Sequence, residues 1–246
     1  MKKTLILIPS RMGASRLPGK PLLKINNLSI VSHVLKRAVE ADIGQVVVAT
    51  DDQKILNDVL KNGGKAILTN KDHKTGTDRI FEAYKKLNIK NVDYILNLQG
   101  DEPNINKDDI ISLNNFMINN KSEIGTLAAK IQDYNMLDNK NVVKVITEKK
   151  LEENNFPKAL NFTRKSLSIN NQNIYHHIGI YSYKVKVLEK IISLDQTNNE
   201  IENKLEQLRA LDNGLKINVA LAKSSPIGVD TEEDYLAIKK IMEYKS

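Results

Sequence analysis

Residues 6 to 22 of this chain read Ile-Leu-Ile-Pro-Ser-Arg-Met-Gly-Ala-Ser-Arg-Leu-Pro-Gly-Lys-Pro-Leu, a short apolar run that leads directly into a basic loop. The run from Leu5 to Ile8 predicts a strand that is buried on both faces. Pro9 ends it, because proline cannot donate a hydrogen bond to a sheet ladder. The basic side chains that follow are Arg11, Arg16 and Lys20. They come after the carboxyl end of a strand, where open α/β sheets bind their ligands.

The same loop has features that suit a phosphate group. Gly13 and Gly19 let the backbone approach a ligand closely, and arginine and lysine donate charge-assisted hydrogen bonds to phosphate oxygens. The G-x-x-x-x-x-G-K spacing differs by one residue from the P-loop pattern, and no Ser or Thr follows Lys20, so an ordinary P-loop NTPase is excluded. On composition and position alone, a triphosphate-binding loop and a solvated basic loop are equally good interpretations.

Composition narrows the class of protein. The 246 residues are 41% hydrophobic, which is enough for one large domain with a substantial core. The absence of cysteine excludes disulfides and thiolate metal sites. No apolar stretch suits a signal peptide or a membrane span, so we expect a cytoplasmic protein without a membrane partner. The chain has a net charge of +7, but its basic residues form no stripe with aromatic residues, and this disfavours a nucleic-acid-binding module.

The order of the predicted elements indicates an α/β fold. In the first half, strands at 5–8, 45–49, 65–68 and 94–98 alternate with helices at 29–41, 54–61 and 78–87. This rhythm predicts right-handed βαβ units and a mostly parallel, Rossmann-like central sheet. Beyond residue 105 we expect strands at 126–131, 142–147, 159–163, 178–183 and 217–222, and helices at 107–119, 185–193, 201–211 and 231–244. The closely spaced strands of this half predict a mixed, antiparallel extension of the sheet.

Two carboxylates stand out as candidate ligands for a hard cation. Asp101 lies on a glycine turn directly after the strand at 94–98, and Mg²⁺ is usually held by one or two carboxylates together with substrate phosphates. The alternative is an acidic turn that caps the next helix. Asp230 precedes the last helix, where a metal ligand and a helix cap formed with Thr231 are equally compatible with the pattern.

Other polar segments are candidates for substrate contacts. The stretch from His73 to Arg79 opens a helix, so its backbone N–H groups and Arg79 could meet a base, ribose or phosphate. The alternative is a capped helix with Asp78 in its first turn. Asp51 also ends a predicted strand, and we interpret it as a helix cap. The pair His176-His177 has no Cys, His or Glu partner at a zinc-like spacing, which argues against a metal site, and one of the two could contact an anionic or hydroxyl-rich substrate. No nucleophile triad is present. A triphosphate loop with a metal carboxylate favours nucleotidyl transfer, which depends on positioning and electrostatics.

Taken together, these segments resemble the 3-deoxy-manno-octulosonate (Kdo) cytidylyltransferase family over essentially the whole chain. The motifs that carry the resemblance are Ile8-Pro9-Ser10-Arg11, Arg16-Leu17-Pro18-Gly19-Lys20-Pro21-Leu22, Val48-Ala49-Thr50-Asp51, Gly76-Thr77-Asp78-Arg79, Gln99-Gly100-Asp101-Glu102-Pro103, His177-Ile178-Gly179-Ile180-Tyr181, Leu205-Glu206-Gln207-Leu208-Arg209 and Val229-Asp230-Thr231. The resemblance implies a fold of the nucleotide-diphospho-sugar transferase type. It also implies that CMP is moved from CTP to the anomeric hydroxyl of a Kdo-type acid sugar for lipopolysaccharide assembly, with Mg²⁺ as cofactor and a homodimer as the assembly.

The resemblance also assigns roles to residues of this chain. It implies that Arg11, Arg16 and Lys20 hold the CTP phosphates and that Gly76 and Arg79 line the cytidine side. Asp101 and Asp230 would bind Mg²⁺ as part of a two-metal arrangement, so the implied catalytic residues are Arg11, Lys20, Asp101 and Asp230. The implied contacts to the sugar acid are Gln99, Arg164, His177, Glu206 and Gln207. We expect a single domain over 1–246, with a nucleotide-binding half at about 1–105 and a sugar-binding and dimerisation half at about 106–246.

Three departures from the family pattern lie near the implied sugar end. They are the segment Lys165-Ser166-Leu167-Ser168 after Arg164, the pair Leu211-Asp212, and His176 in place of a common arginine. They leave Kdo and a derivative such as 8-amino-Kdo open as the sugar. A sialate-type cytidylyltransferase is a further alternative, and a catalytically silent nucleotide-binding module is the alternative of another class.

Overall fold

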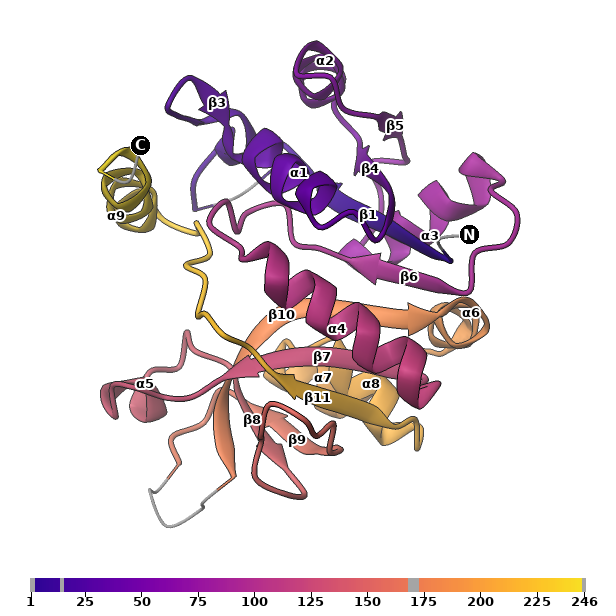
Figure 1. Ribbon diagram of the computed structural model, residues 1–246, viewed down its shortest axis with the longest axis vertical. Helices are drawn as coiled ribbons and strands as arrows, with labels where there is room; N and C mark the ends of the chain where they lie inside the picture. Colours follow the sequence, from indigo (N-terminus) through magenta and orange to yellow (C-terminus); the bar gives the residue numbers. More distant parts are fainter. Residues whose placement is uncertain (1–2, 14–15, 168–172, 245–246) are drawn as a thin grey trace. The chain divides into compact units, whose positions relative to one another are not determined.

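The computed structural model describes residues 3–13, 16–167 and 173–244, and these form two compact units (Figure 1). Unit 1 comprises Met1–Ile110 and Pro226–Ser246, and unit 2 comprises Ile111–Ser225. The boundary falls within helix α4 (Lys107–Asn120), which therefore begins in unit 1 and ends in unit 2.

Unit 1 contains a parallel sheet with the strand order β6-β1-β4-β5. Its strands are β1 (Thr4–Ser10), β4 (Gly44–Thr50), β5 (Ala66–Leu68) and β6 (Tyr94–Asn97), and a small hairpin is formed by β2 (Lys24–Ile25) and β3 (Leu28–Ser29). Its helices are a 3₁₀ helix at Lys20–Leu22, α1 (Ile30–Glu40), α2 (Gln53–Lys61), α3 (Gly76–Leu87) and α9 (Glu232–Glu243). The predicted βαβ order and the parallel sheet are confirmed.

Local sequence explains the first βαβ unit. The side chains of Leu5 to Ile8 are almost fully buried, as expected for the central strand of a parallel sheet. The Ser29 side chain accepts a hydrogen bond from Ser32 N and so caps α1. The apolar stripe of this helix, which includes Val34 and Leu35, is buried. The register of β1 against β4 pairs Ser10 with Thr50, so both strands end at the same edge of the sheet.

The last segment of the chain returns to unit 1, whereas the expected halves placed it with the second half. Val229 and Ile238 join Ile25 and Ile30 in one buried apolar cluster. The Tyr235 hydroxyl also donates to the carbonyl of Lys24 at 2.7 Å. Burial of apolar side chains that are about two hundred positions apart in the chain therefore decides where this segment lies.

Unit 2 has a mixed sheet of five strands in the order β11-β7-β10-β8-β9, in which only the β11 and β7 pair is parallel. Its strands are β7 (Ile124–Ala129), β8 (Lys144–Thr147), β9 (Ala159–Thr163), β10 (Ile174–Lys184) and β11 (Ile217–Leu221). Its helices are α5 (Asn135–Asp138), α6 (Val185–Ser193), α7 (Asn198–Asn203) and α8 (Gln207–Asp212). The antiparallel strands that the sequence predicts beyond residue 105 are therefore present.

The prediction of one continuous helix at 201–211 is wrong, because the structure has two short helices, α7 and α8, in this region. Lys204 adopts a left-handed conformation with φ of +52° and ends α7. The chain then starts again as α8, directly after Glu206. Within residues 3–13, 16–167 and 173–244, no helix combines the length and the apolar character that crossing a bilayer would need.

Candidate functional site

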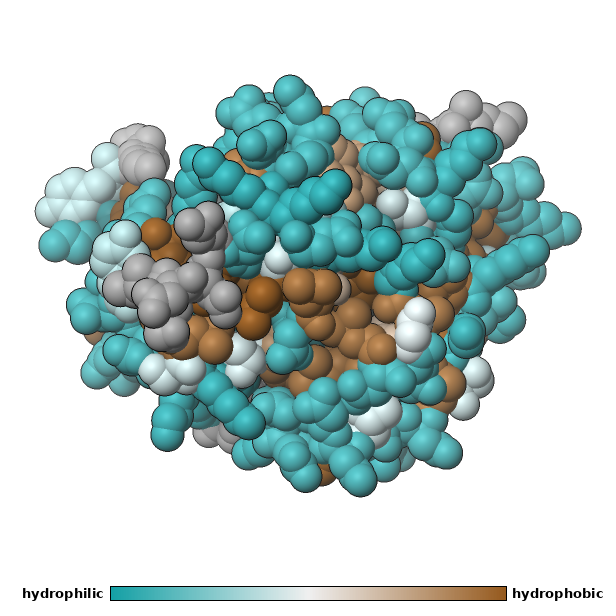
Figure 2. Space-filling view, turned by 90° about the horizontal axis from the view of Figure 1, so that it is seen from below, coloured by the Kyte–Doolittle hydropathy of each residue, from teal (hydrophilic) through white to brown (hydrophobic). Residues whose placement is uncertain are grey.

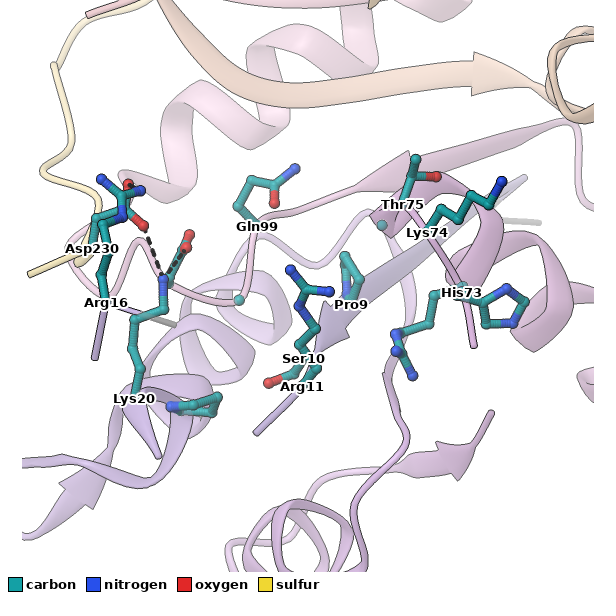
Figure 3. A pocket seen from close by; sticks show the side chains of 15 residues that line it. Pro9, Ser10, Arg11, Arg16, Lys20, His73, Lys74, Thr75, Gln99 and Asp230 are labelled. Atoms are coloured by element: carbon teal, nitrogen blue, oxygen red, sulfur yellow. Dashed lines mark hydrogen bonds and ion pairs between the residues drawn. The ribbon is translucent and has the colours of Figure 1, made fainter. Parts of the chain in front are cut away.

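A pocket of about 310 Å³ opens in unit 1 at the carboxyl ends of its parallel strands (Figure 3). It is lined by Pro9, Ser10, Arg11, Arg16, Lys20, Pro21, His73, Lys74, Thr75, Gly76, Arg79, Gln99, Gly100, Asp101 and Asp230. The structure thus brings together all the expected site residues of unit 1, which are distant in the sequence. These are Arg11, Arg16, Lys20, Gly76, Arg79, Gln99, Asp101 and Asp230.

Backbone geometry places Lys20 at this pocket. Gly19 has a φ of +74°, a conformation that suits glycine, and its N–H donates to the carbonyl of Met12. The chain then turns into the 3₁₀ helix that begins at Lys20, and Pro21 is the buried residue of this helix. Arg11 has no hydrogen-bond or ion-pair partner among the described residues, so its guanidinium is available to a ligand.

The other basic side chains of the loop contact the two candidate carboxylates. Lys20 Nζ lies 2.7 Å from Asp101 Oδ2 and 3.2 Å from Asp230 Oδ1. Arg16 Nη2 lies 2.9 Å from Asp230 Oδ2. Burial alone would lower the pKa of Lys20, but Asp101 and Asp230 more than offset burial and the pKa is raised. The ammonium is therefore held in its charged form between both carboxylates.

Asp101 and Asp230 are held next to each other by the backbone. Gly100 approaches β1 so closely that a Cβ there would lie 2.8 Å from the carbonyl oxygen of Pro9. Val229 N donates to the carbonyl of Asp101 at 2.9 Å and joins the two acidic segments. The neighbouring carboxyl of Glu102 is buried, and burial together with Asp101 raises its pKa to about 8. The Glu102 carboxyl is therefore neutral at pH 7.

Asp230 could have been a cap of the last helix instead of a metal ligand, but Thr231 fills that role. Thr231 caps α9, with its side chain accepting from Asp234 N, so the Asp230 carboxylate points into the pocket instead. Among the described residues no group of three or more His, Cys, Asp or Glu side chains could hold a metal. The pair of carboxylates around one cation nonetheless matches the donor set of Mg²⁺, which completes its shell with phosphate oxygens and water.

The wall of the pocket opposite these charges is the start of α3. Thr75 and Asp78 form a reciprocal capping box, which fixes the first turn of the helix. Arg79 is only 3% exposed, and its Nη2 lies 2.8 Å from Asp51 Oδ2. Our interpretation of Asp51 as a helix cap is therefore wrong. Asp52 is the cap of α2 and accepts from Lys54 N, because the side chain of Asp51 is drawn to Arg79.

The remaining expected residues, Arg164, His177, Glu206 and Gln207, lie in unit 2. His177 is buried, and burial lowers its pKa to about 3. Its Nε2 is 3.0 Å from Thr126 Oγ1, and that hydroxyl is 2.7 Å from the carbonyl of Ile180. Because a hydroxyl has one proton and gives it to this carbonyl, His177 Nε2 must be the donor and Nδ1 is left as the acceptor nitrogen.

Arg164 follows β9 and is fixed by backbone carbonyls. Its Nη1 donates to Asn141 O at 3.0 Å. Lys144 is completely buried and donates to the carbonyls of Asn139 and Arg164, which ties the same two segments together. The segment 165–168 after Arg164 departs from the family pattern. Its last position, 168, lies outside the described residues, while the Ser166 hydroxyl donates a hydrogen bond to the Asp138 carboxylate.

Glu206 and Gln207 lie at the beginning of α8, which is anchored to α7 by a buried ion pair. Arg209 Nη2 is 2.6 Å from Glu200 Oε1, and Arg209 Nε is 2.8 Å from Glu200 Oε2. The departure at Asp212 has a structural explanation, since its carboxylate accepts hydrogen bonds from Thr197 and Asn199 of the α7 start. The departing His176 is hydrogen-bonded to Ser225.

Sequence reasoning missed several residues that the structure places beside these groups. Asp51 was recognised as a strand-end carboxylate but not as the partner of Arg79. Tyr181 is buried with its ring 5.4 Å from that of His177, and Thr126 orients the imidazole. The spacing of His177 and Tyr181 within one strand was visible in the sequence. The role of Thr126, on a different strand, had no local signal.

Comparison with known proteins agrees with these observations. The family described as Cytidylyltransferase matches residues 5–217. A 3-deoxy-manno-octulosonate cytidylyltransferase from Afipia carboxidovorans is 43% identical over 97% of this chain and 96% of its own length. A solved structure of CMP:2-keto-3-deoxy-manno-octonic acid synthetase complexed with CTP is 34% identical, with a TM-score of 0.89 over 99% of this chain and 100% of that one.

A more distant structure shows how widely the fold is shared. UDP-glucose pyrophosphorylase complexed with UDP-glucose is 14% identical and has a TM-score of 0.74, over 99% of both chains. This confirms the expected nucleotide-diphospho-sugar transferase type of fold. The extent of the sequence match over nearly the whole chain shows that this protein belongs to the 3-deoxy-manno-octulosonate cytidylyltransferase family.

Proposed function

We propose that the protein transfers CMP from CTP to the anomeric hydroxyl of Kdo with release of pyrophosphate, and so supplies an activated sugar for lipopolysaccharide assembly. The observation that carries the proposal is the unit 1 pocket, in which a basic loop meets the carboxylates of Asp101 and Asp230. The 43% identity to a relative named for this reaction supports the choice of substrates.

In this proposal the triphosphate lies along the basic loop. Arg11 is already available, while Arg16 and Lys20 exchange their carboxylate partners for phosphate oxygens. The nucleoside lies toward the start of α3, beside Gly76 and Arg79. Holding the triphosphate at several points fixes the α-phosphorus in line for attack, and positioning of this kind supplies a large part of catalysis in phosphoryl transfer.

We assign Asp101 and Asp230 to Mg²⁺. The two carboxylates converge on a single ammonium in this structure, so the space between them suits a cation. When bound, Mg²⁺ would offset the negative charge on the transferring phosphoryl group and on the leaving pyrophosphate, and would orient the sugar hydroxyl. Asp101 and Asp230 hold their positions through the backbone bond between Val229 and Asp101.

The acid sugar is assigned to the residues that remain. These are Gln99 in the pocket and Arg164, His177, Glu206 and Gln207 in unit 2. Arg164 would pair with the sugar carboxylate. In the reaction the anomeric oxygen forms a bond to the α-phosphorus, the bond from that phosphorus to the oxygen bridging the β-phosphorus breaks, and the hydroxyl proton is released.

We further propose that the protein is cytoplasmic, because its substrate CTP is found there. We also propose that it is a homodimer, because an apolar surface of the protein would be covered by a second copy of the chain. Figure 2 shows apolar residues gathered on one face with hydrophilic residues around them. In unit 2, Leu160 of β9 is 61% exposed. Ile146 of β8 and its paired residue Ile174 are partly exposed. We expect Leu160→Asp to weaken the dimer in sedimentation experiments. A variant that sediments as the wild type does would contradict a dimer interface at β9.

The proposed function is tested by measuring pyrophosphate release from each nucleoside triphosphate with Kdo, 8-amino-Kdo and a sialic acid, with Mg²⁺ and with a chelator. We expect release with CTP and a Kdo-type sugar, loss of release with the chelator, and a CMP-sugar phosphodiester by phosphorus NMR. Release with 8-amino-Kdo alone or with the sialic acid alone would reassign the sugar. CTP binding without turnover for any sugar would make the protein a silent nucleotide-binding module.

A further inference from the structure

A buried ion pair at the edge of the pocket joins three elements of unit 1. Arg79 lies in the first turn of α3, and its guanidinium contacts Asp51, which follows β4, at 2.8 Å. The same guanidinium donates to Thr69 Oγ1 at 2.7 Å and to the carbonyl of Asn70 at 3.3 Å, just after β5. One side chain therefore holds the ends of two parallel strands against the start of a helix.

A second side chain of α3 ties down the rest of the same segment. The Glu82 carboxylate accepts from Asn70 N at 2.8 Å and also contacts His73 and Lys86. Burial alone would raise the pKa of Glu82, but the hydrogen bonds from Lys86, Asn70 and His73 more than offset burial and lower it to about 2. Residues 69–75 are thus anchored to α3 at two points, by Arg79 and by Glu82.

The anchored segment continues into the wall of the pocket. His73, Lys74 and Thr75 line the pocket on the side away from Lys20 and Asp230 (Figure 3). Gly76, the next residue, also lines the pocket. Gly76 lies close to Pro9, since a Cβ at Gly76 would be 3.4 Å from Pro9 Cγ. The separation between this wall and β1 therefore sets the space available at that end of the pocket.

Arg79 is better placed to position this wall than to bind a phosphate. It is 3% exposed, and its charge is balanced by Asp51. Three of its hydrogen bonds go to Asp51, Thr69 and Asn70 of the protein itself. A guanidinium that is buried, paired and bonded in this way has little left to offer an anionic ligand, whereas the neighbouring Arg11 is available for one.

We propose that Asp51 acts through Arg79 as a positioning residue for nucleobase selection, by fixing how closely residues 73–76 approach Pro9. The inference rests on the proposed function, because it assigns the α3 wall to the base of CTP. A wall held at a fixed distance admits a cytosine ring in one pose and lets backbone groups distinguish it from uracil, while a loosened wall loses both constraints.

The test compares Asp51→Asn with Asp52→Asn, a matched control in the adjacent residue. Asp52 caps α2 and takes no part in the Arg79 network. We expect Asp51→Asn to weaken CTP binding by about tenfold or more in calorimetry and to reduce the ratio of kcat/KM for CTP over UTP by a similar factor, with kcat at saturating CTP nearly unchanged. Asp52→Asn should leave both the affinity and the ratio at their wild-type values.

The outcomes separate the inference from the function on which it rests. Wild-type protein that binds no CTP would overturn the proposed function and this inference with it. Wild-type protein that binds CTP, with Asp51→Asn as tight and as selective as Asp52→Asn, would overturn the inference alone. If Asp51→Asn fails to fold, Glu82→Gln loosens the same segment from its solvent side, and unchanged selectivity in that variant would count equally against the inference.

Discussion

Lys20 Nζ lies 2.7 Å from Asp101 Oδ2, although 81 positions separate the two residues in the chain. The same ammonium is 3.2 Å from Asp230 Oδ1, so it occupies the space between the carboxylates that we assign to Mg²⁺. A lysine and a divalent cation repel each other strongly at such separations. We therefore expect Lys20 to compete with the metal in the nucleotide-free protein and to be released when the triphosphate binds.

A Lys20→Met variant tests this competition, because methionine keeps an apolar stem and removes the charge. We expect Mn²⁺ to bind the nucleotide-free variant about tenfold more tightly than the wild type, which corresponds to about 1.4 kcal/mol. CTP should bind more weakly, since a phosphate partner is lost. Mn²⁺ binding is followed by electron paramagnetic resonance. The control is Arg16→Met, which loses a contact to Asp230 alone and should change Mn²⁺ binding less. Weaker Mn²⁺ binding to Lys20→Met would contradict the competition.

Asp101→Asn and Asp230→Asn should each reduce turnover by about a hundredfold or more, because the loss of an acidic ligand removes charge stabilisation from the transferring group. Both side chains are partly exposed, so the fold should survive. Steady-state pyrophosphate release measures the first effect and thermal unfolding the second. Near-normal turnover in either variant would remove that residue from the metal site.

The sequence predicted the parts of this site that depend on local pattern. The β1 strand, the glycine turn at Gly100 and the cap at Thr231 are each encoded within a few neighbouring residues. Asp51 and Asp52 could not be told apart in this way. The sequence places both after a strand, and only the position of Arg79, 28 residues further along, decides which of them caps α2 and which forms the ion pair.

Two other features also depend on contacts that local sequence does not show: the break between α7 and α8, and the place of the last segment of the chain. Ile201, Leu205 and Leu208 have a helical spacing that continues across Lys204, so the pattern gave no sign that Lys204 would adopt a left-handed conformation. The segment that carries Asp230 was assigned to the second half by its position in the sequence. Its place in unit 1 is set by apolar contacts of Val229 and Ile238, which local pattern does not reveal.

Stability should fall at acidic pH in a way that depends on His177. Its folded-state pKa is about 3 because of burial, against an ordinary value of 6.5, so between these values the unfolded chain binds a proton that the folded chain does not. Stability is therefore lost as the pH falls from about 6.5 toward 3, by on the order of 1 kcal/mol at pH 5.5. We expect His177→Gln to lose less stability than the wild type between about pH 7.5 and about pH 5.5 in denaturant titrations. Equal losses in both proteins would contradict the buried, neutral imidazole.

Gly100→Ala should disturb the floor of the pocket, because the new methyl group would lie 2.8 Å from the carbonyl oxygen of Pro9. Backbone has to move to relieve this contact, and we expect a loss of about 1–3 kcal/mol in stability together with weaker CTP binding. Gly228→Ala is the control, since a Cβ there meets no atom within 4 Å. If the two variants unfold at the same temperature and bind CTP alike, the close approach of Gly100 to β1 is not required.

The buried pair of Arg209 and Glu200 should support use of the sugar without affecting CTP binding. Arg209→Met leaves the Glu200 carboxylate buried and without its bidentate partner, which typically costs about 3–5 kcal/mol. Because α8 also begins at Gln207, loosening this helix should raise the KM for the sugar. The CTP pocket is lined by residues of unit 1, so the calorimetric affinity for CTP should be unchanged. The double variant Glu200→Leu/Arg209→Met removes both charges and should recover most of the stability. A double variant less stable than Arg209→Met alone would contradict the desolvation argument, and an unchanged sugar KM in a destabilised Arg209→Met would separate α8 from the sugar site.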